Sequence, residues 1–397
     1  MQTAQVSSLI SKYLHLLQDP SDPVTRTLTR DLPLTTGLHP LSVQAMTAAF
    51  AQGWSPAAVQ RLDQLWQPFE TIPMQRVAVV APTNVPAALW QAVLGPLLAG
   101  AEVRLRPGSE DLHTAQQLIE SLALFSPDLA ARVELHAFAQ ADQAHWSALV
   151  EDCDVLAVHG SDQAVAAVFA LAAARGFAGR MVGHGTLQSC AVVSAQYATD
   201  QALFAHIAPL LLGDALMADG RGCMSLRAIH VIGSLSPPAW QGLVDQLAHA
   251  LAKVVKQLPA GTMAHAIQAQ ARLAVEEIEF AAALQGRAAT VHSVGDARLL
   301  AQQDGPVRCS ELGPAARVLA VYGYPSENEW LQAVAPWRNR LGVVAVAGSF
   351  APDLFDRAGV HRLCAPGQMQ APPLDRAAEG RLPLSDYLRV VDRRISL

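Results

Sequence analysis

Residues 76–106 read RVAVVAPTNVPAALWQAVLGPLLAGAEVRLR, and this stretch decides the fold class. Val77–Val80 form a short apolar run that is typical of a buried strand. Ala87–Leu98 follow with a helical pattern that ends at Gly100, and Glu102–Leu105 are strand-like again. Short strands that alternate with helices of this length predict βαβ units and therefore a parallel sheet. Such sheets bind cofactors at the carboxyl ends of their strands.

The alternation of strands and helices continues beyond this stretch. The next patterns are helical at 111–124, 145–150 and 163–174 and strand-like at 133–136 and 155–158. A second region begins near Asp200, with a helix to about Met217, a strand at 228–232, long helical patterns at 238–256 and 264–284, and a strand–helix–strand stretch at 318–347. Residues 1–70 are predicted to be helices interrupted by prolines. We find no repeat and no low-complexity linker, so we expect interleaved domains.

Composition favours a compact globular enzyme. A chain of 397 residues suggests two or three domains. Hydrophobic residues make up 51% and charged residues 16%, which favours large buried surfaces, including a subunit interface. The net charge is -6, and no basic run exceeds the pair Arg393-Arg394, so nucleic acid is not expected as a partner.

The cysteines and the N-terminus indicate a cellular compartment. The chain has five cysteines, Cys153, Cys190, Cys223, Cys309 and Cys364. Their wide spacing shows no CxxC pair and no Cys/His cluster, so no metal site is expected, and free thiols fit a reducing cytoplasm. The N-terminus lacks a signal-peptide pattern, and the most apolar helical run, 164–174, is too short to span a bilayer. We therefore expect a cytoplasmic protein without a membrane span.

Two polar residues follow predicted strands of the first region. Asn84 lies in a turn between Pro82 and Pro86, where its amide can donate to a developing oxyanion, although an ordinary turn asparagine explains the same residue. Arg106 ends a strand and can pair with a ribose or a 2′-phosphate. The alternative for Arg106 is a solvated arginine at a sheet edge.

Glycine-flanked segments supply three further candidates. Gly160 and Ser161 follow a strand and open a helix, whose backbone N–H groups can receive a pyrophosphate. A simple N-cap at Ser161 accounts for the same residues. Gly183-His184-Gly185 is only a fragment of a dinucleotide fingerprint, but it places His184 in a glycine-flanked turn.

The segment Gly220-Arg221-Gly222-Cys223 is the strongest candidate for a nucleophile. Two glycines leave the backbone bare and give access to the sulfur, and a thiolate attacks carbonyl carbon well at neutral pH. A buried structural cysteine is the alternative, and we favour it for the other four cysteines. Glu311, which precedes a strand, can accept from a ribose hydroxyl or be a charged turn residue.

In order and spacing, these segments resemble the aldehyde-dehydrogenase superfamily and, within it, the LuxC-type acyl-CoA reductase family. The resemblance extends from about residue 50 to the end. It is visible in NVP at 84–86, VHGSD at 158–162, GHG at 183–185, RGCMS at 221–225 and GQMQAPP at 367–373. The resemblance implies that Cys223 attacks a thioester and forms an acyl-enzyme, and that Asn84 and the backbone N–H of Cys223 form the oxyanion hole.

The resemblance also implies a nicotinamide cofactor, which delivers a hydride to the acyl carbon so that aldehyde leaves. Arg106, Gly160 and Ser161 match positions that hold the dinucleotide, and Glu311 matches a glutamate that contacts the nicotinamide ribose. Arg106 replaces the more usual lysine, which favours NADPH through its 2′-phosphate and leaves NAD possible.

The chain departs from classical aldehyde dehydrogenases where they carry a glutamate base. The corresponding residues here are Met181-Val182-Gly183-His184. That base activates water to hydrolyse the acyl-enzyme, so its absence suits an enzyme whose acyl group meets hydride or a thiol. We assign His184 to proton transfer. The chain is short for the superfamily, and we expect a trimmed oligomerisation arm.

The resemblance gives each region a function. Residues 1–200 are expected to form an NAD(P)-binding domain with a helical N-terminal segment, and residues 201–350 a catalytic domain that carries Cys223. Residues 351–397 are expected to return to the cofactor domain or to a subunit interface. The fold class is α/β and aldehyde-dehydrogenase-like, with a Rossmann-type parallel sheet plus an α/β catalytic domain, and we expect a homo-oligomer.

The leading functional prediction is NAD(P)H-dependent reduction of an acyl thioester to an aldehyde. The donor is expected to be a fatty acyl-CoA or an acyl-carrier thioester. Aldehyde oxidation and acyl-phosphate reduction are alternatives, and the missing glutamate argues against the first. A further alternative is a non-catalytic subunit that carries an acyl group or binds an acyl-protein synthetase or transferase. Cofactor binding separates the enzyme from that subunit.

Overall fold

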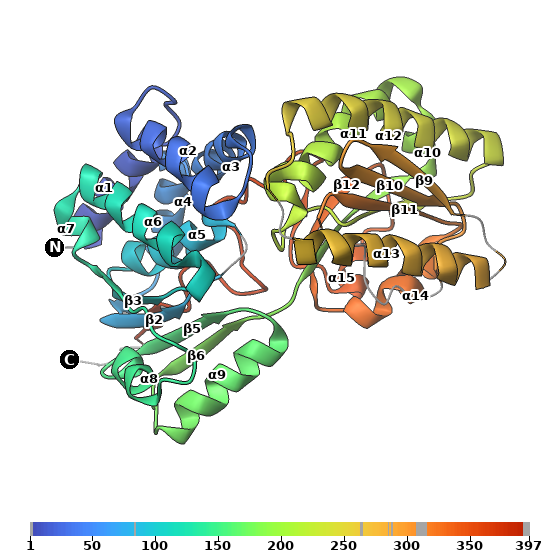
Figure 1. Ribbon diagram of the computed structural model, residues 1–397. Coiled ribbons are helices and arrows are strands. Elements are labelled where there is room, and N and C mark those ends of the chain that lie inside the picture. Colours follow the sequence, from blue (N-terminus) through green and yellow to red (C-terminus); the bar gives the residue numbers. More distant parts are fainter. Residues whose placement is uncertain are drawn as a thin grey trace. The chain divides into compact units, whose positions relative to one another are not determined.

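The computed structural model describes residues 3–82, 85–262, 265–284, 286, 289–306 and 316–391. The chain folds as two compact units, which are seen in Figure 1. The first unit contains Met1–Thr36, Thr47–Thr186 and Ala371–Leu397, and the second contains Gly37–Met46 and Leu187–Gln370. Each unit therefore draws on separated parts of the sequence.

The first unit is built on a five-stranded sheet in the order β4-β3-β2-β5-β6, with every neighbouring pair parallel. Its strands are β2 (Arg76–Val80), β3 (Glu102–Arg106), β4 (Val133–Leu135), β5 (Val155–His159) and β6 (Arg180–His184). From β2 the chain builds outward to β4 on one side and then crosses to β5 and β6 on the other. This arrangement creates a switch point at the carboxyl ends of β2 and β5, where such sheets bind ligands.

Helices cover both faces of this sheet (Figure 1). They are α1 (Thr3–Leu16), α2 (Pro23–Thr36), α4 (Pro56–Trp66), α5 (Pro86–Leu98), α6 (Leu112–Phe125), α7 (Pro127–Ala130), α8 (Gln143–Val150) and α9 (Asp162–Ala174). Ala78 and Val80 of β2 pack with Leu156 of β5 against α8 and α9. Their neighbours Val77 and Val79 are equally buried and point to the opposite face, because successive side chains of a strand alternate.

The second unit contains a seven-stranded mixed sheet in the order β13-β12-β7-β8-β11-β10-β9. Only the pairing of β9 with β10 is antiparallel among the described strands of this sheet. The strands are β7 (Gln188–Ser194), β8 (Ala228–Ile232), β9 (Thr290–Val294), β10 (Ala297–Gln302), β11 (Val318–Tyr324), β12 (Leu341–Ala347) and β13 (Leu363–Cys364).

Two hydrophobic cores lie on the two faces of the second sheet. One core joins it to α11 and α12, and the other joins it to α13, α14 and α15. Figure 1 shows these two groups of helices on opposite faces of the sheet. The helices are α10 (Ala195–Thr199), α11 (Gln201–Leu216), α12 (Pro237–Gln257), α13 (His265–Leu284), α14 (Glu327–Val334) and α15 (Leu354–Ala358). Helix α3 (Pro40–Gly53) leaves this unit and enters the first one.

The C-terminal segment returns to the first unit only from Ala371 onward. There β14 (Leu388–Val390) pairs antiparallel with β1 (Thr71–Pro73). Arg180 ties the segment to β6, since its guanidinium donates to the carbonyl oxygen of Ser385 at 2.7 Å. Residues 187–200 belong to the second unit, whereas the expected domain boundary was at residue 200. The functions expected of the two units stay predictions.

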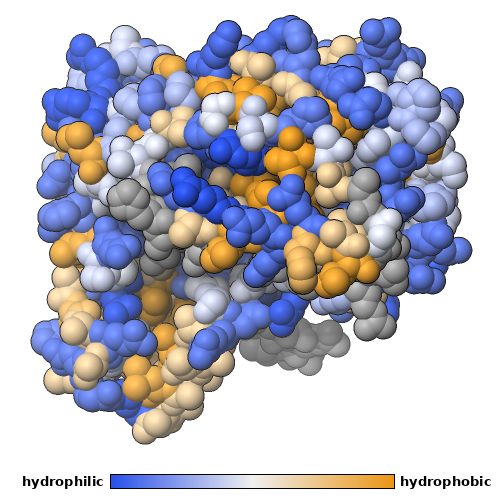
Figure 2. Space-filling view, turned by 45° about the vertical axis from the view of Figure 1, so that its right-hand side comes forward, coloured by the Kyte–Doolittle hydropathy of each residue, from blue (hydrophilic) through white to orange (hydrophobic). Residues whose placement is uncertain are grey.

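Helix α11 with the following turn, Gln201–Gly220, is the one described helix that is long and apolar enough to cross a membrane. Half of its apolar window is buried inside the protein, as in a core helix, so it is weak evidence for a span. On the face in Figure 2, hydrophobic residues lie between hydrophilic ones. Large exposed hydrophobic side chains include Leu273, Phe280 and Leu284 of α13.

Candidate functional site

Cys223 occupies an exposed turn of the second unit. The turn spans Gly222–Ser225 and is closed by a hydrogen bond from the Ser225 N–H to the Gly222 carbonyl oxygen, at 3.1 Å. By contrast, Cys153 and Cys190 are buried, and burial raises the pKa of Cys153 to about 11. Burial raises the pKa of Cys364 to about 11 as well. Among the four described cysteines, Cys223 is thus the one whose position suits a nucleophile.

The backbone ahead of Cys223 adopts an uncommon conformation. Ala218, Asp219 and Gly220 have φ values of 51°, 54° and 67°, in the left-handed region. That region is unfavourable for residues with a Cβ, so the surrounding contacts must hold Ala218 and Asp219 there. One such contact is the Ala218 N–H, which donates to the Ser42 hydroxyl at 3.0 Å.

A buried ion-pair network also holds Asp219 in this backbone conformation. The carboxylate of Asp219 lies 3.2 Å from the guanidinium of Arg317 and 3.3 Å from that of Arg221, and it also accepts from the Gly261 N–H. Asp219 and Arg317 are both fully buried at their side chains. Arg317 in turn contacts Asp296 at 2.8 Å. This network fixes the turn before Cys223. Sequence analysis missed it because Asp219 and Arg317 stand far apart in the chain.

Gly160 and Ser161 follow β5 at the switch point of the first unit, and their assignment to a dinucleotide site stays a prediction. The Gly160 N–H donates to the carbonyl oxygen of His184 at 3.1 Å, which links the ends of β5 and β6. Ser161 is the N-cap of α9 and accepts from the Ala164 N–H at 3.2 Å. A Cβ added at Gly160 would lie only 3.3 Å from the Ala164 side chain. Glycine therefore keeps the backbone at this helix start bare.

Arg106 ends β3 and lies against two aromatic rings. Its guanidinium carbon is 4.7 Å from the ring centre of Trp146 and 5.1 Å from that of Phe138. Burial lowers the pKa of Arg106, but a guanidinium stays charged at neutral pH. The side chain is thus a half-buried cation held by cation–π contacts, and the alternative of a freely solvated arginine is wrong.

His184 is the last residue of β6, and the predicted glycine-flanked turn is wrong for Gly183 and His184. The strand continues because His184 pairs in register with His159 of β5. The two imidazole rings stack with centres 4.2 Å apart and 10° between their planes. Burial, followed by the neighbouring His184, holds the pKa of His159 well below its usual value.

The C-terminal segment supplies a carboxylate to His184. Nδ1 of His184 lies 3.0 Å from Glu379, and Glu379 lies 3.1 Å from Arg381. Burial alone would raise the pKa of Glu379, but its contacts with His184 and Arg381 outweigh that effect and lower it. Glu379 is therefore an anion that orients the imidazole of His184. His159 and Glu379 were not predicted as site residues, although His159 lies within the VHGSD motif at 158–162.

Two predicted site residues, Asn84 and Glu311, lie outside the described residues. Cys309 lies outside them as well. Within the described part of the chain, no group of three or more His, Cys, Asp and Glu side chains could hold a metal ion.

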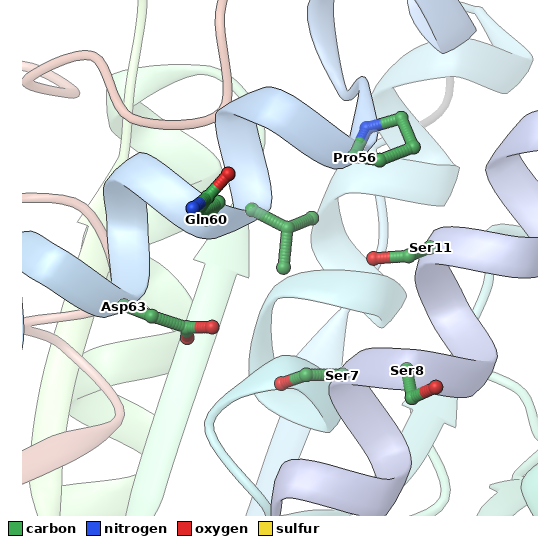
Figure 3. Close-up of a pocket in the computed structure, with 7 residues that line it drawn as sticks. Ser7, Ser8, Ser11, Pro56, Gln60 and Asp63 are labelled. Carbon is green, nitrogen blue, oxygen red and sulfur yellow. The ribbon is translucent and has the colours of Figure 1, made fainter.

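A groove of about 440 Å³ lies between α1 and α4 of the first unit. Figure 3 shows the hydroxyls of Ser7, Ser8 and Ser11 on one side and Gln60 and Asp63 on the other. Burial raises the pKa of Asp63. The groove contains no predicted site residue, and it has no part in the chemistry discussed below.

Solved structures with this fold belong to the aldehyde dehydrogenase superfamily. An oxidoreductase from Marinobacter aquaeolei is 14% identical, with a TM-score of 0.70 over 98% of this chain and 86% of that chain. Aldehyde dehydrogenase 21 from Physcomitrella patens is 14% identical, with a TM-score of 0.69 over 98% and 85%. An NAD-dependent aldehyde dehydrogenase from Sinorhizobium meliloti is 16% identical, with a TM-score of 0.70 over 98% and 81%. The predicted fold class is confirmed.

The model of the acyl-CoA reductase (LuxC) family matches residues 62–390, which is most of the chain. The chain belongs to this family, as its sequence predicts. A comparison with curated protein sequences gave no significant match.

Proposed function

We propose that the protein reduces an acyl thioester, in the first place a fatty acyl-CoA, to the aldehyde with NADPH. The observation that carries the proposal is the exposed Cys223 on a preset turn, in a chain of the acyl-CoA reductase family. The network around Asp219 supports it, because a nucleophile gains most when its backbone is fixed before the substrate arrives.

The residues at the carboxyl edge of the first sheet fit a nicotinamide dinucleotide. Gly160 and the start of α9 offer a bare backbone to the pyrophosphate, and Arg106 presents a planar cation that suits a 2′-phosphate. Glu311 would contact the nicotinamide ribose. The bound dinucleotide would supply the hydride. NADH lacks the 2′-phosphate, so the contact with Arg106 is what would favour NADPH.

The chemistry at Cys223 proceeds in two stages. The thiolate attacks the thioester carbonyl, and the C–S bond to coenzyme A breaks, which leaves an acyl-cysteine and a coenzyme A thiolate. Hydride then adds to the acyl carbon, and the resulting oxyanion collapses to the aldehyde while the cysteine thiolate leaves. We assign Asn84 and the backbone N–H of Cys223 to the oxyanion in both stages. One proton is consumed overall, and it ends on coenzyme A.

His184 is our candidate for the group that moves this proton. Its Nδ1 faces the Glu379 carboxylate, so the Nδ1 proton is directed there and Nε2 carries the lone pair. The chain lacks a glutamate base before Gly185, and water activation is correspondingly weak. An acyl-cysteine that resists water can persist until hydride reaches it.

The test is NADPH oxidation with a panel of acyl-CoA esters and acyl-carrier thioesters, with analysis of the product. Aldehyde formation that depends on the thioester supports the proposal. NADPH binding without turnover of any thioester would contradict thioester reduction and direct attention to acyl phosphates. Absence of both turnover and dinucleotide binding would favour a non-catalytic acyl-carrying subunit.

A further inference from the structure

The hydroxyl of Ser189 connects the turn that carries Cys223 to the sheet of the second unit. Ser189 is fully buried on β7. Its Oγ donates to the carbonyl oxygen of Cys223 at 2.7 Å, which is a typical distance for a hydrogen bond between two oxygens. The same Oγ accepts from the Val343 N–H at 3.3 Å. A hydroxyl has a single proton, so this arrangement directs it at Cys223.

An irregularity in β12 makes the second of these contacts possible. The register between β12 and β7 shifts between Leu341 and Val343, with Val343 opposite Ser189. A bulge of this kind frees a backbone N–H from the ladder, and here the Ser189 hydroxyl satisfies it. Gly342 occupies the bulge, and a Cβ at that position would lie 3.2 Å from the Leu187 side chain. The sheet is thus shaped locally around this serine.

Other contacts hold the turn on both sides of the nucleophile. Asp219 fixes the residues before it, as described above. After it, Gln370 donates to the Ser225 hydroxyl at 3.3 Å, and the Leu226 N–H donates to the Asp214 carbonyl oxygen at 3.3 Å. Ser189 differs from these residues because its hydroxyl contacts Cys223 itself.

We propose that Ser189 is a positioning residue for thioester reduction. By holding the carbonyl of Cys223, it sets the peptide plane between Cys223 and Met224, and with it the direction of the thiol. This inference rests on the proposed function of Cys223. It adds a residue that acts on the nucleophile from the core of the unit, without contact to substrate.

The test compares Ser189→Ala with Ser121→Ala. Ser121 is a matched control because it is also buried, donates to a backbone carbonyl at 2.7 Å, and lies in the other unit. The measurement is the rate of acyl-enzyme formation from acyl-CoA without NADPH, followed by intact mass, alongside the thermal midpoint Tm. We expect both variants to lower Tm, and Ser189→Ala alone to slow acylation about tenfold or more. Wild-type acylation rates in Ser189→Ala would overturn the inference.

A second variant and a second measurement test the inference if the first experiment fails. If Ser189→Ala does not fold, Ser189→Cys keeps the size and a weak donor, and it should slow acylation to an intermediate rate; an unchanged rate again overturns the inference. If the wild type forms no acyl-enzyme with any thioester, the proposed function fails by itself. Ser189 is then judged by alkylation of Cys223 with iodoacetamide, which Ser189→Ala should slow about fivefold or more. Equal alkylation rates would refute the positioning role.

Discussion

The imidazole rings of His159 and His184 lie face to face, 4.2 Å apart, at the ends of two neighbouring parallel strands. Glu379 contacts one of the two rings, that of His184, and it does so from the C-terminal segment. Two stacked imidazolium ions would repel each other, and burial already disfavours the charged form of His159. The pair is therefore asymmetric, because the Glu379 carboxylate orients the ring of His184.

Replacement of His184 or Glu379 tests this asymmetry. We expect His184→Asn and Glu379→Gln to lower kcat by about tenfold to a hundredfold while the Kd for NADPH stays unchanged, because proton transfer is lost and the fold is kept. Steady-state kinetics and fluorescence titration measure the two quantities. His113→Asn is a control, since this exposed histidine contacts Gln116 on its own helix. Wild-type kcat in both His184 and Glu379 variants would rule out the assigned role.

Arg106 is predicted to decide between the two nicotinamide cofactors. Arg106→Ala should raise KM for NADPH about tenfold or more and leave KM for NADH within about twofold, since a charge-assisted contact to the 2′-phosphate is removed. The ratio of kcat/KM values for NADPH and NADH is the measurement. Arg76→Ala, at the start of β2 and paired with Glu102, serves as the control and should leave the ratio unchanged. A ratio that Arg106→Ala does not alter would show that the cofactor's phosphate binds elsewhere.

The Asp219–Arg317 pair is predicted to dominate the stability of the turn that precedes Cys223. Arg317→Ala leaves the buried Asp219 carboxylate with one guanidinium fewer, and we expect it to lower the free energy of unfolding by about 3–5 kcal/mol. The exposed pair Arg61–Asp375 is the comparison, and Arg61→Ala should cost less than about 1 kcal/mol. Urea unfolding curves of both variants give these values. Similar midpoints for the two variants would contradict a buried structural ion pair.

His230 should make the protein less stable in mild acid. It is fully buried between Tyr324 and Trp330, and burial lowers its pKa to about 3. The folded-state pKa lies below the unfolded value of about 6.5, so His230 is neutral in both states above pH 6.5. As the pH falls below 6.5, the unfolded chain takes up a proton that the folded protein does not, and the free energy of unfolding decreases. At pH 5.5 this cost is about 1.4 kcal/mol relative to neutral pH. His159, whose pKa is also lowered by burial, adds to the same trend.

The measurement for His230 is the pH dependence of Tm between pH 7.5 and 5.5. His230→Phe keeps an aromatic ring in the core and should lose less stability over this range than the wild type. A wild-type and a variant curve that run parallel would show that His230 is not held neutral in the folded protein.

Local patterns were sufficient to predict the βαβ architecture of the first unit. The runs around Val77–Val80, Glu102–Leu105 and Val155–Val158 are β2, β3 and β5, because apolar strands and capped helices are encoded within a few residues. The error at Gly183 has a physical reason. A Cβ there would come within 2.8 Å of the Val165 side chain on α9, so the glycine serves close helix packing inside a strand and does not mark a turn.

The parts of the site that sequence analysis missed depend on long-range contacts. Asp219 meets Arg317, 98 residues away, and His184 meets Glu379, 195 residues away. The segment Gly37–Met46 joins the second unit, where Ser42 contacts Ala218, although its neighbours in sequence lie in the first unit. No periodicity or turn signal marks Arg317, Glu379 or Ser42, since each is an ordinary polar residue in the sequence until the fold brings its partner near.

The covalent acyl-enzyme on Cys223 is the central claim, and intact mass spectrometry tests it most directly. The protein is incubated with a long-chain acyl-CoA in the absence of NADPH, and the modified peptide is located after digestion. We predict one acyl group per chain on the peptide that contains Cys223, its release as aldehyde on addition of NADPH, and no adduct in Cys223→Ala. An adduct of equal amount in Cys223→Ala, or NADPH-dependent aldehyde formation by that variant, would contradict the account.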